Sequence, residues 1–261
     1  IEKDPTYAAA HAGLADMAAS AGFWGFLPSA QACLKAKAAA RRSLAIEENG
    51  EARAALGWAT LIHDYDYPAA EREFQRAIAL YPGYAPTFQW YGHCLMCSGR
   101  LQEGLEQNRQ ALRLDPLSLI AHVCYVAGIW FAREWDRCID DCRRALEIDP
   151  NFMGLHWMRA NALQGKGDHE QAIRARQQAL ETAPGSAMCL AELANSYAAA
   201  GIRGEALKLL EQLHEMRGER YVMAYWIAGI YCSLNDKDEA FQWLDRALEE
   251  RSSQLAYVNV D

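Results

Sequence analysis

The sequence of 261 residues lacks the features that mark several classes of protein. It has no long run of basic residues, and the densest, Lys35 to Arg42, is short. The chain carries 26 Lys and Arg against 34 Asp and Glu, a net charge of −8. Because a phosphate-binding surface needs clustered Lys and Arg, this segment is not expected to bind nucleic acid. No apolar run approaches the roughly 18–20 residues that span a bilayer, so no membrane partner is expected.

Signals for secretion are also missing. The first residues, IEKDPTYAAAH, have no basic end followed by an apolar stretch, which a signal peptide would show. The eight cysteines are unevenly spaced, and several lie in helix-like segments. In a chain of this length without a signal sequence, they are expected to be free intracellular thiols rather than a disulfide framework. We therefore expect a cytoplasmic location.

Catalytic motifs are equally scarce. The stretch GLADMAASAGFWG lacks the Lys-Ser/Thr ending of a phosphate-binding loop and follows no expected strand. There is no nucleophile elbow. Acid pairs such as Glu47-Glu48, Asp140-Asp141 and Glu249-Glu250 are expected at helix ends or outer faces, on solvated surface. The sequence thus predicts no catalysis and no cofactor.

What the chain does have is a 34-residue repeat. Pro82, Pro116, Pro150 and Pro184 are evenly spaced by 34, and the segments that end at them match: AIALYP, ALRLDP, ALEIDP and ALETAP. One further step reaches Gly218, and one step back reaches Glu48. An Asp4-Pro5 pair lies 43 residues before Glu48, so the first unit carries about nine extra residues. We expect this insert around residues 22–31.

Each unit contains two helix-length segments joined by a short turn. In residues 85–114, APTFQWYGHCLMC and LQEGLEQNRQALRL are expected to be helices around a turn at 98–100. Gly99, Gly167 and Gly201 occupy one position of the repeat, where a first helix ends and needs a left-handed residue. Small residues recur every 34 positions where the helices must approach closely: Ala70, Gly104, Cys138, Ala172, Ala206 and Ala240. A second column holds Ala77, Ala111, Ala145, Ala179 and Ala247, with Ser43 and Leu213 as its departures.

With Gly92, Tyr197 and Tyr231, this pattern resembles the tetratricopeptide repeat (TPR) family over essentially the whole chain. The resemblance implies an all-α fold, an α-solenoid of about seven helix-turn-helix repeats and fourteen helices wound into a right-handed superhelix. We expect a single array over 1–261. Its units are approximately 5–48 with the insert, 49–82, 83–116, 117–150, 151–184, 185–218 and 219–251, followed by a tail at 252–261.

Three stretches carry a closer resemblance. PAAEREFQRAIALYPGYAPTFQWYGHCL, LRLDPLSLI, and GEALKLLEQLHEMRGERYVMAYWIAGIY followed by AFQWLDRALEERS resemble the C-terminal TPR arrays of bacterial signalling proteins. Such arrays commonly follow a winged-helix DNA-binding domain, a nucleotide cyclase domain or a protein kinase domain. The resemblance implies that this chain is a segment of a larger bacterial regulator in signal transduction, with more sequence before Ile1.

Helical phase then predicts a concave surface built by the first helix of each unit. Its middle is aromatic and apolar, with amides around it, which suits an apolar helix face or an extended segment of a protein partner. The column Ala12, Ala55, Gln89, Val123 and Trp157 holds no Lys or Arg, which argues against a carboxylate clamp. The predicted partner-binding residues are Gln89, His93, Met96, Ile120, Trp130, Phe131, Trp157, Asn161, Gln164, Met188, Asn195 and Tyr225.

Other interpretations stay open. The aromatic residues could instead pack on neighbouring repeats or be covered by another domain of the parent chain. The array could also drive self-association into a homodimer through its Trp-rich faces. A metal site from His63, His93 and Cys97, or a small ligand in the groove, is a further alternative, although no fourth metal ligand is evident. The main hypothesis is a non-catalytic scaffold that binds a protein or peptide.

Overall fold

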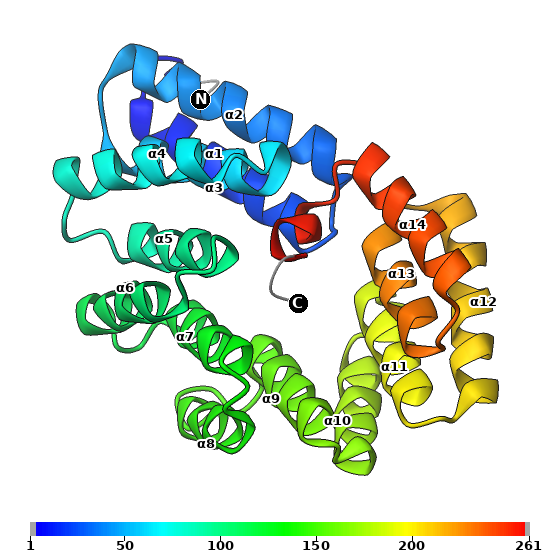
Figure 1. The fold of residues 1–261 in the computed structure, drawn as a ribbon. Helices are drawn as coiled ribbons and strands as arrows, with labels where there is room; N and C mark the ends of the chain where they lie inside the picture. Colours follow the sequence, from blue (N-terminus) through cyan, green and yellow to red (C-terminus); the bar gives the residue numbers. More distant parts are fainter. Residues whose placement is uncertain (1–3, 259–261) are drawn as a thin grey trace. The chain divides into compact units, whose positions relative to one another are not determined.

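The computed structural model describes residues 4–258, which form fourteen α-helices and one short 3-10 helix and contain no strand (Figure 1). The all-α fold and the fourteen helices expected from the repeat are confirmed. The chain divides into two compact units. Unit 1 takes in the described residues up to Gly128 and again from Arg251, and unit 2 spans Ile129–Glu250. No helix in the described part of the chain is long and apolar enough to cross a membrane.

Unit 1 holds three complete helix pairs, the larger part of a seventh helix and the short 3-10 helix. Consecutive helices pack against each other as hairpins. The elements are α1 (Ala8–Phe23), α2 (Ser29–Ile46), α3 (Gly50–Asp64), α4 (Tyr67–Leu80), α5 (Ala85–Cys97), α6 (Leu101–Leu114), α7 (Leu119–Phe131, which passes into unit 2 after Gly128) and η1 (Ser253–Tyr257).

Unit 2 begins with the end of α7 and continues with the remaining helices. The expected alternation of first and second helices holds through this unit as well. Its elements are α8 (Trp135–Ala145), α9 (Met153–Lys166), α10 (His169–Thr182), α11 (Ala187–Ala199), α12 (Arg203–Glu219), α13 (Ala224–Ser233) and α14 (Lys237–Glu249).

The first helix of each repeat ends in a left-handed residue, as the glycine positions predicted. Gly99, Gly167 and Gly201 have φ of +81°, +88° and +76°. The same repeat position is also left-handed where no glycine stands there: the residues are Tyr65, Arg133 and Asn235, with φ of 56°, 59° and 60°. The turn geometry is therefore set by the packing of the two helices, and three repeats adopt it with a side chain present.

The extra residues of the first repeat are spread over three places. Compared with the third repeat, α1 is three residues longer than α5, α2 is four longer than α6, and the connecting loop is two residues longer. Only part of the insert thus lies in the expected window of residues 22–31. The longer helices extend the first pair, and the loop exposes Phe26, whose side chain is 80% exposed.

Small residues allow the helices of a pair to approach closely. Ala70, Cys138, Ala172 and Ala206 are completely buried. In the third repeat, a Cβ added to Gly92 would lie 2.2 Å from Asn108 Oδ1 and 2.9 Å from the Gly104 carbonyl oxygen. The two backbones of α5 and α6 therefore touch where the repeat places its small residues.

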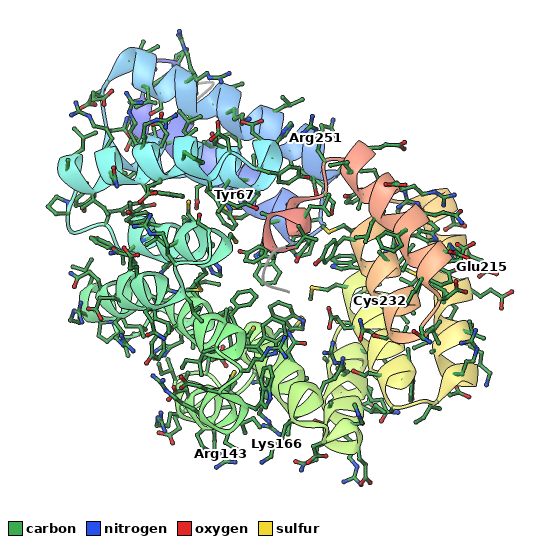
Figure 2. The ribbon with its side chains drawn as sticks, in the orientation of Figure 1. Tyr67, Arg143, Lys166, Glu215, Cys232 and Arg251 are labelled. Carbon is green, nitrogen blue, oxygen red and sulfur yellow. The ribbon has the colours of Figure 1, made fainter. Side chains whose placement is uncertain are left out.

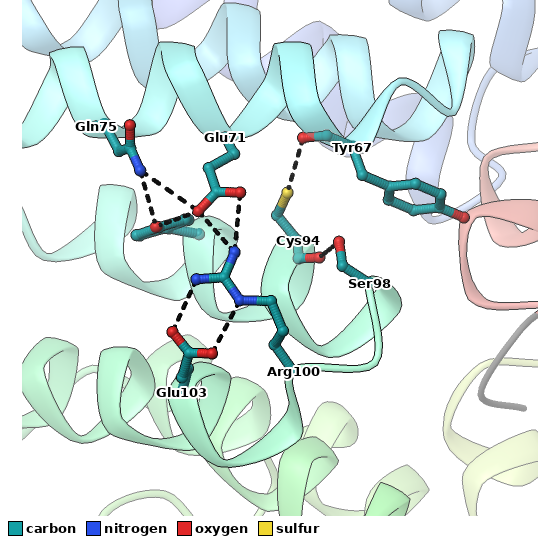
Figure 3. A network of polar contacts seen from close by, with 8 residues as sticks. Tyr67, Glu71, Gln75, Cys94, Ser98, Arg100 and Glu103 are labelled. Atoms are coloured by element: carbon teal, nitrogen blue, oxygen red, sulfur yellow. Dashed lines mark hydrogen bonds and ion pairs between the residues drawn. The ribbon is translucent and has the colours of Figure 1, made fainter.

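A polar network on unit 1 joins three helices (Figure 3). The guanidinium of Arg100 donates to both carboxylate oxygens of Glu71 on α4, at 2.9 and 3.0 Å, and to Glu103 on α6, at 2.9 and 2.7 Å. Tyr91 on α5 donates its hydroxyl proton to Glu71 at 2.7 Å. The bonds from Arg100 hold the pKa of Glu103 below its ordinary value. The network links α4, α5 and α6.

Candidate partner-binding surfaces

The predicted partner-binding residues divide between the two units, so each unit has its own part of the first-helix surface. The division follows the unit boundary within α7. Unit 1 holds Gln89, His93, Met96 and Ile120, and unit 2 holds Trp130, Phe131, Trp157, Asn161, Gln164, Met188, Asn195 and Tyr225.

In unit 1, His93 faces a residue from the far end of the sequence. The hydroxyl of Tyr257 in η1 lies 3.0 Å from His93 Nδ1, and both side chains are buried. The two rings meet edge to face, with centroids 5.7 Å apart. Burial lowers the pKa of His93 to about 4 and raises that of Tyr257 well above its ordinary value. A neutral imidazole that is hydrogen-bonded to a neutral tyrosine fits both shifts.

Aromatic rings surround this pair. Trp58 on α3 stacks on Trp90 of α5, with centroids 4.4 Å apart and planes 19° apart. The centroid of the His93 ring lies 6.1 Å from the ring centroid of each of these tryptophans. The ring centroids of Phe23 and Tyr257 are 6.0 Å apart. The rings come from the first helices α1, α3 and α5, although Trp58 and Trp90 stand at different positions of the 34-residue repeat.

Further hydrogen bonds hold the rest of residues 252–257. Tyr65 donates its hydroxyl proton to the Ser252 carbonyl oxygen at 2.9 Å. Tyr67, labelled in Figures 2 and 3, donates to the Ala256 carbonyl oxygen at 3.2 Å. Ser253 Oγ donates to the Gly22 carbonyl oxygen at 3.2 Å, and the Gln254 amide to that of Phe23 at 3.3 Å. The surface of unit 1 is thus occupied by the chain itself.

The other three predicted residues of unit 1 have different surroundings. Met96 is fully buried, and its side chain fills the space beside Gly104 and Gly128. This placement corrects the expectation that Met96 lines an open surface: the two glycines leave a gap that a long, flexible side chain fills. Gln89 is also buried, whereas Ile120 is 38% exposed.

His63, His93 and Cys97 do not form a metal-binding cluster. Within residues 4–258, no three His, Cys, Asp or Glu side chains lie close enough to share a metal ion. His93 Nδ1 is hydrogen-bonded to the Tyr257 hydroxyl instead, while His63 Nδ1 lies 3.3 Å from an oxygen of Asp64. Burial raises the pKa of the Cys97 thiol, which disfavours the thiolate that a metal would need.

In unit 2, Trp130 and Phe131 form an aromatic cluster with Trp135 on α8. The rings of Trp130 and Phe131 meet edge to face at 5.1 Å, and Trp130 lies 6.2 Å from Trp135. Both predicted residues are half-buried. Their packing partners account for part of their surface and leave part accessible.

A shallow cleft lies between α9, α10 and α11, and the space in it that a water-sized group can occupy is about 20 Å³. Trp157 and Met188, both predicted to bind a partner, lie on its walls and are half-buried. The lining residues are Met153, His156, Trp157, Ala160, Ala175, Arg176, Ala179, Met188, Cys189 and Glu192.

The wall of the cleft contains a buried arginine that the sequence did not single out. Arg176 is 5% exposed, forms an ion pair with Glu192 and donates to Asn161 Oδ1 at 2.6 Å. Burial lowers the pKa of Arg176 to about 9. Asn161 was expected to contact a partner. Its hydrogen bond to Arg176 also offsets part of the free-energy cost of burying this cation. The 34-residue pattern gave no sign of this role, because Arg176 is not repeated at the corresponding positions.

The remaining amides of unit 2 link successive first helices. The Gln164 amide donates to Asn195 Oδ1 at 3.0 Å and accepts from Ser196 Oγ at 2.7 Å. Asn195 also accepts from Ser233 Oγ at 3.2 Å. This chain of bonds runs along α9, α11 and α13, and Tyr225 lies half-buried at the start of α13. Both amides are thus part of the packing between repeats, and both are half-buried.

No family model and no curated protein matches this sequence. Solved structures do match its fold. A TPR protein of Parabacteroides merdae is 12% identical over 94% of this chain and 98% of its own, with a TM-score of 0.63. A thermophilic TPR protein of Thermus thermophilus is 18% identical over 76% and 99%, with a TM-score of 0.59. PilF of Pseudomonas aeruginosa is 16% identical over 80% and 95%, with a TM-score of 0.53. The chain has the fold of a TPR solenoid.

Proposed function

We propose that this chain is a non-catalytic scaffold for protein–protein interactions, the cytoplasmic sensory or docking arm of a larger bacterial signalling regulator. Its partner is a protein or peptide segment, which another domain of the parent chain could also supply. The TPR solenoid fold supports a scaffold in general terms. The role in signalling rests on the resemblance of the repeat segments to the arrays of bacterial regulators.

The first-helix surface of unit 2 supplies the binding site in this proposal. The observation that carries it is the shallow cleft between α9, α10 and α11, beside which Trp157 and Met188 are half-exposed. An aromatic side chain beside an apolar cleft is the usual anchor of a protein interface. The half-exposed amides of Asn161, Gln164 and Asn195 around it have capacity for further hydrogen bonds to a partner backbone. Trp130 and Phe131 on α7 and Tyr225 on α13 are further aromatic residues on the first helices, and the proposal includes them in the binding site.

Site-specific photocrosslinking in cells that carry the intact gene tests this proposal. A photoreactive amino acid replaces Met188 at the cleft, and a matched control replaces Gln178, an exposed residue of α10. We expect one dominant crosslinked protein from position 188 that is absent from position 178. The same product from both positions, or no product from position 188, would refute the proposed binding site on unit 2.

A double variant, Trp130→Ala with Trp157→Ala, measures how much these two side chains contribute to the free energy of partner binding. Loss of one such anchor costs roughly 2 kcal/mol or more of binding, so the affinity for the crosslinked partner should fall at least about 30-fold. Far-UV circular dichroism should show that the helical content is kept. Unchanged affinity in a folded double variant would mean that these residues are packing residues only.

Self-association is a second candidate, favoured by one stripe on α14. Phe241 and Leu248 are 67% and 55% exposed and lie seven residues apart, on one face of the helix. Sedimentation equilibrium over a wide concentration range tests it. A dimer that Phe241→Asp dissociates would support this candidate, and a wild-type monomer at every concentration would remove it.

A further inference from the structure

The first-helix surface of unit 1 already binds a peptide segment, namely residues 252–257 of the same chain. This segment follows the last helix pair and forms only the single turn η1. It packs on α1 and α3, and Tyr257 reaches His93 on α5. Ser252, Ser253 and Ala256 are completely buried. Because an isolated turn of this length is not stable in water, the surface of unit 1 must impose its conformation.

Two tyrosine hydroxyls recognise the backbone of the segment. Tyr65, the residue after α3, and Tyr67, the first of α4, donate to the carbonyl oxygens of Ser252 and Ala256. Such bonds do not depend on the side chains of the bound segment. Unit 1 therefore offers preplaced donors to any chain that follows the same path.

The side chains of the segment supply the selectivity. Ser253 and Ala256 have no exposed surface, so a larger residue at either position would clash with the surrounding helices. Tyr257 inserts beside Phe23, and its hydroxyl meets His93 Nδ1 at 3.0 Å. A phenylalanine in its place would leave a buried ring nitrogen without its hydrogen bond. The recognised pattern is small–x–x–small–Tyr.

We propose that the surface formed by α1, α3 and α5 is a peptide-binding site for a partner segment of this small–x–x–small–Tyr chemistry, which residues 252–257 occupy in competition with the partner. Because residues 252–257 are covalently linked to unit 1, their effective concentration at the site is high. They therefore exclude ligands of low affinity, and only a ligand of higher affinity displaces them. This inference goes beyond the function proposed above, because it concerns unit 1 and a different set of residues.

Binding of a labelled peptide to the full chain tests the proposal. The probe is a fluorescent peptide of residues 250–258, ERSSQLAYV, and the control peptide carries alanine in place of the tyrosine. Fluorescence anisotropy is measured with the wild type, with Tyr257→Ala and with Tyr7→Ala, which changes an exposed tyrosine of the same unit. We expect Tyr257→Ala to bind the probe at least tenfold more tightly than the wild type and than Tyr7→Ala. The control peptide should bind none of them measurably.

The outcome is decisive in either direction. Folded Tyr257→Ala protein that does not bind the probe, or that binds both peptides equally, would overturn the proposal. If circular dichroism shows that Tyr257→Ala is unfolded, Tyr257→Phe takes its place with the same expected order of affinities. A wild-type dimer that the probe dissociates would assign the surface to a second copy of the chain and would also overturn the idea of a separate partner.

Discussion

Tyr257 and His93 are 164 positions apart in the sequence, yet the tyrosine hydroxyl lies 3.0 Å from the imidazole Nδ1 atom in the interior of unit 1. This bond closes the contact between residues 252–257 and the first helices. It also places a titratable pair at the centre of an aromatic cluster, so it has consequences for stability that can be measured.

Replacement of Tyr257 by phenylalanine tests the strength of this bond. The ring and its packing remain, but a buried nitrogen of His93 loses its hydrogen bond. We expect a loss of about 1–2 kcal/mol of stability, measured as the free energy of unfolding in urea. Tyr7→Phe, which alters a largely exposed tyrosine, is the matched control and should change nothing. Equal stability of Tyr257→Phe and the wild type would show that the bond contributes nothing.

The pH dependence of stability follows from the same histidine. Burial lowers the pKa of His93 from 6.5 to about 4, so the unfolded chain takes up this proton more readily than the folded one. The contribution of His93 is complete above its unfolded pKa and is lost as the pH falls from about 6.5 towards 4. Between pH 7 and pH 5 this amounts to about 2 kcal/mol.

His93→Gln provides the comparison for this prediction. Glutamine does not titrate, so the variant should lose less stability than the wild type between the same two pH values, whatever its stability at pH 7. Urea unfolding at both pH values gives the two differences. His63 and His214 also have lowered pKa values and contribute equally to both proteins, so they cancel. Parallel losses in the two proteins would contradict the buried neutral imidazole.

The left-handed turn at Arg133 predicts a stabilising substitution. Its φ is 59° and its side chain is exposed, while the same repeat position in the next unit is Gly167 with φ of +88°. A non-glycine residue in this conformation costs about 1 kcal/mol. Arg133→Gly should therefore raise the stability of unit 2 by up to about that amount, less the entropy that glycine gains in the unfolded chain.

Gly167→Ala is the reverse experiment in the same unit. Nothing lies within 4 Å of the added methyl group, so only the backbone conformation is affected. We expect a loss of about 1 kcal/mol, and Arg133→Ala should bring no gain. Thermal unfolding of the three variants gives the comparison. A less stable Arg133→Gly protein would show that the arginine side chain makes contacts worth more than the backbone strain.

The repeating part of the fold could be predicted from the sequence because each helix pair is encoded by residues close together in the chain and the same pattern recurs in several repeats. Each copy of the 34-residue pattern has the same helix, turn and small-residue positions. A position that is ambiguous in one repeat can therefore be assigned from its equivalents in the others. Gly99 and Gly167 mark the helix ends directly. The left-handed turns at Tyr65 and Arg133 could be placed only by their register with the glycines, since neither residue favours that conformation.

The candidate sites were less predictable, for two physical reasons. The first is that periodicity cannot assign a face to a helix that is buried nearly all round. In α5 every residue except Pro86 and Trp90 is buried, so the pattern did not separate Met96, which packs in the core, from His93. The second is that residues 252–257 belong to no repeat. Their contacts with Tyr65 and His93 span most of the chain, and nothing local encodes them.

The close approach of α5 and α6 supports a last prediction. A methyl group on Gly92 would lie 2.2 Å from Asn108 Oδ1 and 2.9 Å from the Gly104 carbonyl oxygen, and the backbone cannot move aside cheaply. Gly92→Ala should therefore cost about 1–3 kcal/mol through overpacking. Gly13→Ala, in the middle of α1 with nothing within 4 Å, should instead add up to about 1 kcal/mol because alanine favours the helix. Urea unfolding of both variants checks the sign as well as the size, and a neutral Gly92→Ala would mean that the two helices separate at no cost.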